Sequence, residues 1–248
     1  MVQSIDLNAD LGEGCAFDAE LMSVVSSCNI ACGGHAGDDE SMRTALVLAK
    51  QSGVVAGAHP SFPDRENFGR KKVVIARDEL ERSLTDQVRR LKAIADDLSV
   101  PLQHLKPHGA LYNLAARDAD LSTSIINVLK HVLPHARLVG PPDSETEMVA
   151  RQSRVAYIAE GFADRAYETD GQLRDRQKPG AVLPSGLAQQ KQALEIAVHA
   201  RVTTYSGSEI AMPADSICVH GDTPGAYDSA RQIRACLLDQ GVSICAPG

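Results

Sequence analysis

The chain has 248 residues, of which 44% are apolar and 23% are charged, and its formal net charge is −7. This is the composition of a globular protein of one large or two small domains, and the acidic balance argues against nucleic acid as a general partner. The longest apolar run, ALVLA at 45–49, is too short to span a bilayer, and the first ten residues lack the basic head and apolar core of a secretory signal. We therefore expect a cytoplasmic protein whose six cysteines are free thiols.

Short apolar runs alternate with helical stretches along the whole chain. The runs expected to form strands are residues 4–10, 26–32, 53–60, 101–109, 136–142, 155–164 and 215–222. Helices are expected between them, and in residues 78–98 apolar side chains recur at steps of three and four, which places them on one stripe. Asp38 and Asp118 precede helical stretches, where a carboxylate favours the positive end, and Gly53 and Gly241 follow helical stretches as caps.

The alternation of strands and helices predicts parallel strands joined by right-handed crossovers. Seven such units in 248 residues are close to the size of a (β/α) barrel, and a doubly wound open sheet is the main alternative. No linker rich in Pro, Gly or Ser divides the chain, so residues 1–248 are expected to form a single domain. Two connections, 60–72 and 162–186, are longer than the fold requires, and such loops serve as lids or as plain surface loops.

Polar residues gather where the predicted strands end, and ligands bind to parallel α/β folds at that edge. The candidate site residues are Asn8, Asp10, Glu13, Asn29, His35, His59, Lys106, His108, Arg165, His220 and Asp222. A lone histidine after a strand is more often a hydrogen-bonded turn residue than a catalyst. Four of the eight histidines follow strands on this one face, however, and that number favours acid–base catalysis or metal binding.

The stretch CNIACGGHAGD, residues 28–38, mixes several signals. Cys28 and Cys32 lie four apart without a second pair at finger spacing, which argues against structural zinc. We expect Cys28 to pack as a small apolar residue and Cys32 to lie near the rim. The two glycines at 33–34 match no nucleotide fingerprint. Asp38 could equally cap the next helix or serve the site.

Six blocks of sequence resemble the LamB/YcsF family: DLNADLGEG, NIACGGHAGD, GAHPSFPD, LKPHGALYN, EGFADRAY and SICVHGDTPGA. They occur in family order and run from residue 6 to residue 226. The resemblance implies a seven-stranded (β/α) barrel similar to that of polysaccharide deacetylases and glycoside hydrolases. It also implies a hydrolase that converts 5-oxo-L-proline to L-glutamate, with ATP consumed to ADP and phosphate, together with partner subunits B and C.

The chemistry of lactam opening suggests roles for some of the candidates. A five-membered lactam is a stable amide, and ATP can drive its opening if the lactam oxygen is phosphorylated, since the carbonyl carbon then becomes electrophilic. Lys106 and Arg165 suit the carboxylate or phosphate. His108 and His220 suit proton transfer. The base or orienting group is then one of two carboxylates, Asp10 or Asp222.

The remaining candidates are expected to bind substrate; they are Asn8, Glu13, Asn29, His35 and His59. An alternative role for Asp10, His35 and His59 is to hold a divalent metal that activates water. Because no nucleotide motif is visible, ATP is expected to bind mainly on the partner subunits. Two other functions stay open, an independent metal-dependent amide hydrolase or deacetylase and a non-catalytic scaffold subunit, as does a homo-oligomer.

Overall fold

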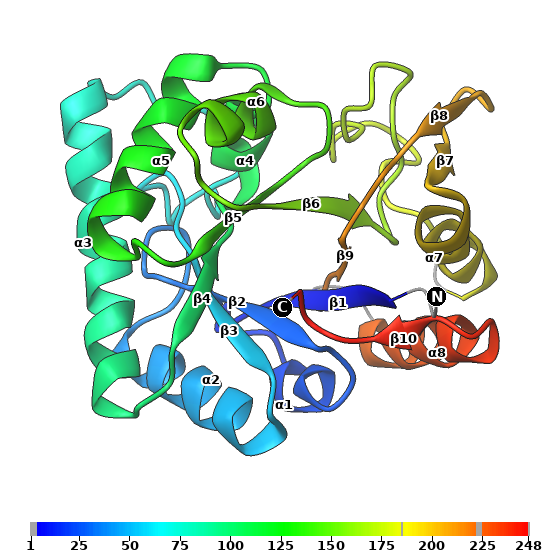
Figure 1. The fold of residues 1–248 in the computed structure, drawn as a ribbon, viewed down its shortest axis with the longest axis horizontal. Coiled ribbons are helices and arrows are strands. Elements are labelled where there is room, and N and C mark those ends of the chain that lie inside the picture. The colour runs from blue at the N-terminus through cyan, green and yellow to red at the C-terminus, as the bar shows by residue number, and fades with distance from the viewer. Residues whose placement is uncertain (1–3, 185, 222–224, 248) are drawn as a thin grey trace.

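The computed structural model describes residues 4–184, 186–221 and 225–247 (Figure 1). Seven parallel strands form a closed barrel, and their bounds are β1 Ser4–Leu11, β2 Ser27–Ala31, β3 Val55–His59, β4 Leu102–Leu105, β5 Arg137–Gly140, β6 Tyr157–Phe162 and β9 Ser216–Val219. Neighbours pair in that order, and β1 also pairs with β9, which closes the barrel. The seven predicted strands and the barrel are thus confirmed, and the open sheet is wrong.

Helices surround the barrel (Figure 1). Their bounds are α1 Asp18–Met22, α2 Asp39–Ser52, α3 Arg77–Asp97, α4 Gly109–Ala115, α5 Ala119–Val132, α6 Glu145–Gln152, α7 Leu187–His199 and α8 Ala226–Asp239. The stripe predicted for residues 78–98 is the buried face of α3, where Leu84, Val88 and Leu91 are at most 1% exposed. None of the described helices is long and apolar enough to cross a bilayer.

Three short strands lie outside the predicted pattern. β7 Arg201–Thr203 and β8 Glu209–Ala211 form an antiparallel hairpin, and β10 Ser243–Ile244 pairs in parallel with the start of β1. With only two or three residues each, these strands are too short to show a hydrophobic period. The predicted fourth strand is also shorter than expected, because the chain leaves the sheet after Leu105, just before Pro107.

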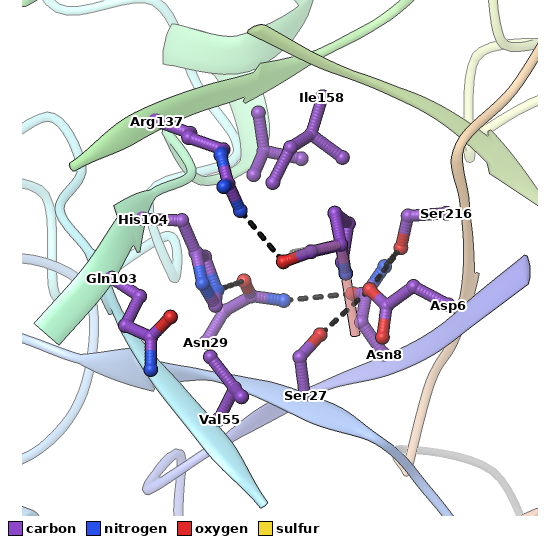
Figure 2. Close-up of a pocket in the computed structure, with 12 residues that line it drawn as sticks. Asp6, Asn8, Ser27, Asn29, Val55, Gln103, His104, Arg137, Ile158 and Ser216 are labelled. Atoms are coloured by element: carbon purple, nitrogen blue, oxygen red, sulfur yellow. Dashed lines mark hydrogen bonds between the residues drawn. The ribbon is translucent and has the colours of Figure 1, made fainter. Parts of the chain in front are cut away.

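The amino-terminal end of the barrel is closed by polar side chains (Figure 2). The carboxylate of Asp6 accepts hydrogen bonds of 2.6–2.7 Å from the hydroxyls of Ser26, Ser27 and Ser216. Arg137 donates to the carbonyl of Pro247 at 2.6 Å, so the carboxy-terminal segment lies across this end. The cavity left here measures about 10 Å³, the space of about one water. A substrate must therefore enter from the opposite end.

Candidate active site

The open cavity lies where the strands end, at the carboxyl face of the barrel, and measures about 580 Å³. Side chains alternate along each strand, so Asn8 and Asp10 of β1 point into the barrel together with Asp6. Nine of the eleven sequence candidates meet at or just beneath this cavity, joined by polar contacts of 2.7–3.9 Å. They are Asn8, Asp10, Glu13, Asn29, His35, His59, Lys106, His108 and His220.

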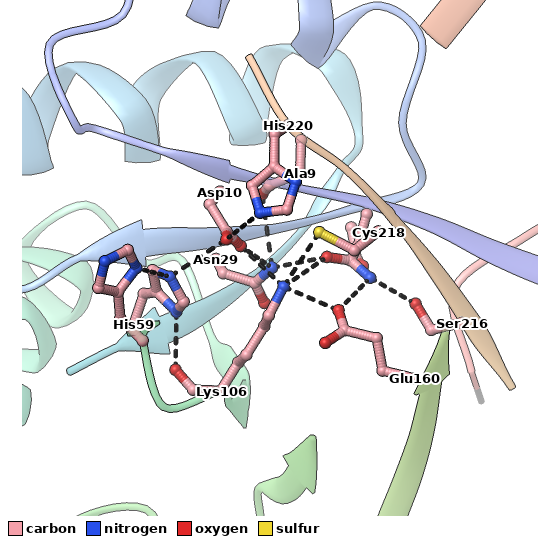
Figure 3. Close-up of polar contacts among 12 residues, drawn as sticks. Ala9, Asp10, Asn29, His59, Lys106, Glu160, Ser216, Cys218 and His220 are labelled. Atoms are coloured by element: carbon pink, nitrogen blue, oxygen red, sulfur yellow. Dashed lines mark hydrogen bonds and ion pairs between the residues drawn. The ribbon is translucent and has the colours of Figure 1, made fainter. Parts of the chain in front are cut away.

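The floor of the cavity is a buried group of charges around Lys106 (Figure 3). Its ammonium, on a side chain 2% exposed, lies 2.9 Å from Asp10 Oδ1 and 2.8 Å from Glu160 Oε1. Burial alone would lower the pKa of Lys106, but Asp10, Cys218 and Glu160 outweigh it and hold that pKa well above its ordinary value. Burial likewise opposes ionisation of Asp10, yet His59 and Lys106 bring the pKa of Asp10 well below its usual range. The floor is therefore ionic at neutral pH.

Amide side chains fix this group from below. Asn8 donates to Glu160 Oε1 at 2.9 Å and to Ser216 Oγ at 2.7 Å. Asn29 donates to the oxygens of Asn8 and Asp10, both at 2.8 Å, and its own oxygen lies 2.8 Å from His104 Nε2. Saturated networks of this kind hold charged groups in one geometry.

Two histidines beside Asp10 form a proton-sharing pair. His59 Nδ1 lies 2.7 Å from the carbonyl of Lys106, and His108 Nε2 lies 3.0 Å from the carbonyl of Phe68; a carbonyl only accepts, so both nitrogens carry hydrogen. The remaining nitrogens face each other at 2.9 Å, and one proton must lie between them. Burial and His59 hold the pKa of His108 well below its ordinary value. Asp10 Oδ2 lies 3.3 Å from His59 Nε2, so the carboxylate adjoins this pair.

His35 and Glu13 complete this side of the cavity. His35 Nε2 lies 2.9 Å from Glu13 Oε1, and its ring stacks on that of His108 with centroids 3.6 Å apart. Burial, together with the charge of His59, lowers the pKa of His35 to about 2. Burial and the neighbouring Asp10 raise the pKa of Glu13. His35 is therefore a neutral hydrogen-bond donor to Glu13.

A second histidine–carboxylate pair lies across the cavity. His220 Nδ1 lies 2.8 Å from Asp164 Oδ2, and its Nε2 lies 3.9 Å from Asp10 Oδ2. Burial would lower the pKa of His220, but the charge and hydrogen bond of Asp164 outweigh it, so that pKa is raised. The ring also stacks on Phe162. Protonated His220 is thus placed as an acid at the cavity wall.

The histidine cluster can also be tested as a metal site. The ligand atoms of Glu13, His35, His59 and His108 lie within 4.8 Å of one another. Four of their separations are 2.9–3.8 Å, near the roughly 3.3 Å edge of a tetrahedron with 2.0–2.1 Å bonds. However, the rings of His35 and His108 are parallel to within 4°, and an imidazole binds a metal in its own plane. One ion cannot lie in both planes without a ring rotation, so this geometry favours hydrogen bonding.

The predicted metal ligands are also divided between two groups. The second group with ligand atoms close together comprises Asp10, Cys218 and His220. Asp10 and His35 therefore belong to different groups of nearby ligand atoms, although each of the two residues lies beside His59. A metal held by Asp10, His35 and His59 stays a prediction.

Two sequence candidates are not part of the buried group. Arg165 lies at the mouth, but its guanidinium donates to the carbonyls of Ala181 and Arg174 at 3.2 and 2.7 Å. These hydrogen bonds hold the 162–186 connection in place, and the Arg165 side chain also lines the cavity. Asp222 lies outside the described residues.

The mouth is basic although the chain is acidic. Its cationic lining residues are Arg70, Lys72, Arg117, Arg165, Arg174 and Arg176. A cleft with one predominant sign of charge raises the local concentration of ligands of the opposite sign. The site is therefore suited to an anionic ligand.

The candidate site residues chosen from the sequence leave out two carboxylates that organise the site, although Asp164 is recognised as a polar residue at the end of the sixth predicted strand. Glu160 pairs with Lys106, and Asp164 pairs with His220. Glu160 lies two residues before Phe162 on β6, so the period of two along a strand could have placed it inside the barrel. Asp164 lies two residues after the end of β6. Its role is identified only by its pairing with His220 across the barrel.

The glycine-rich stretch that follows β2 is a structural turn. Asp38 caps α2, because its Oδ1 accepts from the backbone N–H of Ser41 while the Ser41 hydroxyl accepts from the N–H of Asp38, both at 2.9 Å. Burial raises the pKa of the Cys32 thiol to about 12, so it is not a reactive thiolate. All six cysteines are free, as predicted.

We expect Asp38→Ala to destabilise the fold without changing activity. Loss of a capping side chain costs about 1 kcal/mol in the free energy of unfolding. Urea denaturation would measure the change, and Asp118→Ala, which removes the cap of α5, is the matched variant. A loss of activity at unchanged stability would instead assign Asp38 to the site.

The fold and the site together are those of a (β/α)-barrel protein with ionised acid–base groups at its carboxyl face. The LamB/YcsF family model matches residues 5–247, and the chain belongs to that family. A relative in Histophilus somni, the A component of 5-oxoprolinase, is 43% identical over 98% of both chains. The solved structure of a lactam utilization protein from Thermus thermophilus is 36% identical, with a TM-score of 0.91 over 98% of this chain and 100% of that one.

A family 4 carbohydrate esterase from Streptomyces lividans shares the fold alone. It is 8% identical, with a TM-score of 0.51 over 98% of this chain and 91% of that one. The expected likeness to deacetylase-type barrels therefore holds for the architecture.

Proposed function

We propose that this chain opens the lactam ring of 5-oxo-L-proline as the A component of an ATP-dependent 5-oxoprolinase, which yields L-glutamate, ADP and phosphate. The names of its relatives support the substrate and the existence of further subunits. The observation that carries the proposal is the ionic floor of Lys106 and Asp10, flanked by two histidine pairs beneath a basic mouth.

The basic mouth favours a phosphorylated, and therefore more anionic, lactam as the ligand that this chain binds. The sequence has no nucleotide motif, so we place the transfer of phosphate to the lactam oxygen mainly on the partner subunits B and C. The phosphorylated lactam then carries a carboxylate and a phosphate, and the predominantly basic lining of the mouth has the opposite sign of charge. Lys106 lies where it can neutralise charge that develops on the oxygens at the reacting carbon.

Water must then add to the carbonyl carbon of the phosphorylated lactam. The ionised carboxylate of Asp10, which adjoins the His59–His108 pair, accepts the water's proton. The resulting tetrahedral carbon carries both the ring nitrogen and the phosphate. If phosphate leaves first, the lactam re-forms and ATP is wasted. A proton from His220 to the nitrogen makes the amine leave instead, giving an acyl phosphate that a second water converts to glutamate and phosphate.

A metal-dependent amide hydrolase acting alone is the second candidate. It rests on the proximity of the ligand atoms of Glu13, His35, His59 and His108. Elemental analysis of protein purified without added metal tests it, since about one divalent ion per chain is expected if the metal is resident. A scaffold role would instead leave turnover of the assembly unchanged in His108→Ala.

The proposal is tested by an assay of glutamate, ADP and phosphate. We expect no glutamate from this chain alone, and equal amounts of the three products when subunits B and C are added with 5-oxoproline and ATP. Omission of this chain is the control, and it should abolish glutamate formation. Glutamate formed without ATP would support the metal hydrolase, whereas none from the full assembly would contradict the 5-oxoprolinase function.

A further inference from the structure

A second cavity of about 310 Å³ lies beside the main one. It is built from the ends of β5 and β6, residues 167–173 and β8. The two cavities share a wall that includes Tyr112, Phe162 and Leu173. Tyr112 and Phe162 meet edge to face at this wall, with ring centroids 5.7 Å apart. The pair of cavities is thus one cleft with an aromatic divide.

The balance of charge differs between the two sides of this divide. The side cavity is lined by Asp143, Glu160 and Asp170, and none of its described lining residues is Lys, Arg or His. The main cavity has an excess of cations in its lining, with seven Lys and Arg residues against Asp10, Glu13 and Asp175. Two ion pairs span the divide, Lys106 with Glu160 at 2.8 Å and Arg117 with Asp170 at 3.6 Å. The electrostatic field therefore runs from the main to the side cavity.

Glu160 has a carboxylate oxygen that calls for a donor. Its Oε1 accepts from Lys106 and Asn8, while its buried Oε2 makes no well-formed hydrogen bond among the described residues, although the buried Tyr112 hydroxyl interacts with this carboxylate. The side chain is 1% exposed. A buried acceptor without a donor is costly, and such groups commonly mark a place for a ligand. The Lys106 ammonium lies 5.3 Å from the centroid of the Phe162 ring, so the aromatic divide already contacts one cation.

We propose that this divide binds the ring-opened product as a zwitterion, with its carboxylates in the main cavity and its new ammonium toward the side cavity. The inference rests on the proposed function. The lactam substrate has a neutral nitrogen, which can offer the carboxylates of Glu160 and Asp170 a hydrogen bond but no positive charge. Once the C–N bond breaks and the amine takes up a proton, the field draws the ammonium away from the reacting carbon.

This arrangement would oppose re-closure of the ring. In the acyl phosphate, the free amine is held within reach of the carbonyl carbon and could attack it, releasing phosphate and re-forming the lactam. A protonated amine has no lone pair for that attack. The side cavity stabilises the protonated form, so water becomes the nucleophile that consumes the acyl phosphate.

Calorimetric titration of the isolated chain with L-glutamate and with glutarate tests the subsite. The two ligands differ only by the amino group. We expect glutamate to bind about five-fold more tightly, the range of a partly exposed ion pair. The ratio of the two affinities should fall to about one in the double variant Asp143→Asn/Asp170→Asn. Asp86→Asn, an exposed residue on α3, is the matched control and should keep the ratio.

Equal affinities for the two ligands in the natural chain would overturn the subsite and leave the proposed function intact. An unchanged ratio in the double variant would also overturn it. Failure of both glutamate and glutarate to bind at all would count against the proposed function as well, because the basic mouth would then not hold the product's carboxylates.

Discussion

Replacing Lys106 by methionine should lower activity at least about 10²-fold, the range seen when one group that stabilises transition-state charge is removed. Methionine fills a similar space but has no charge. The buried carboxylates of Asp10 and Glu160 would then repel each other, because the cation that lies between them is gone. Breaking a buried ion pair by removing one partner costs roughly 3–5 kcal/mol, so the variant should also unfold more readily in urea.

A second substitution separates the two effects. Lys106→Met/Glu160→Gln removes one of the orphaned carboxylates and should recover part of the stability, but none of the activity. Lys130→Met, an exposed position on α5, is the control and should match the natural chain in both. Recovery of turnover in the double variant would show that Lys106 acts only through folding.

The barrel could be predicted from the sequence because its strands and helices alternate regularly. The period of three and four in residues 78–98 marks the buried face of α3, and Asp38 and Asp118 cap helices as carboxylates there should. The strands β7, β8 and β10 carry no such signal, since pairs of two or three residues are specified by tertiary contacts.

The site could be predicted in part for the same reason. Parallel strands bring their carboxyl ends together, so histidines after different strands meet, as His59 and His108 do. What the sequence lacks is the pairing across the barrel. Glu160 and Asp164 are 54 and 56 residues from their partners Lys106 and His220, and no local pattern links them. Arg165 is predicted to bind an anion because a guanidinium suits that role. In the structure its guanidinium donates largely to backbone carbonyls instead.

Replacing Asp164 by asparagine should uncouple ATP consumption from ring opening. Asp164 raises the pKa of His220 against the effect of burial. Without that charge, burial lowers the pKa of His220 below its ordinary value of 6.5, and the ring is neutral at pH 7. The proton for the leaving nitrogen is then absent, and phosphate leaves from the tetrahedral carbon first. We expect glutamate formation to fall about 10²-fold, the low end for general acid catalysis, while phosphate release continues.

The pKa shifts of His220 and Asp164 give the direction in which the pH profile of kcat/KM should move in Asp164→Asn. The pKa of His220 is raised in the fold, so its charge and the stability it adds are present below pH 6.5 and lost as pH rises through the folded pKa. The pKa of Asp164 is lowered, so its contribution is present above 3.8 and lost as pH falls through the folded pKa. In Asp164→Asn the alkaline fall of kcat/KM should therefore move to lower pH.

The ratio of phosphate to glutamate separates this role from a structural one. A variant that merely loosens the fold lowers both products together and keeps the ratio near one. Loss of the acid raises the ratio, and acidification of the assay should bring it back toward one as His220 regains its proton. Asp86→Asn should leave both the ratio and the pH profile unchanged. A ratio near one at every pH in Asp164→Asn would contradict the assignment of His220 as the acid that expels the amine.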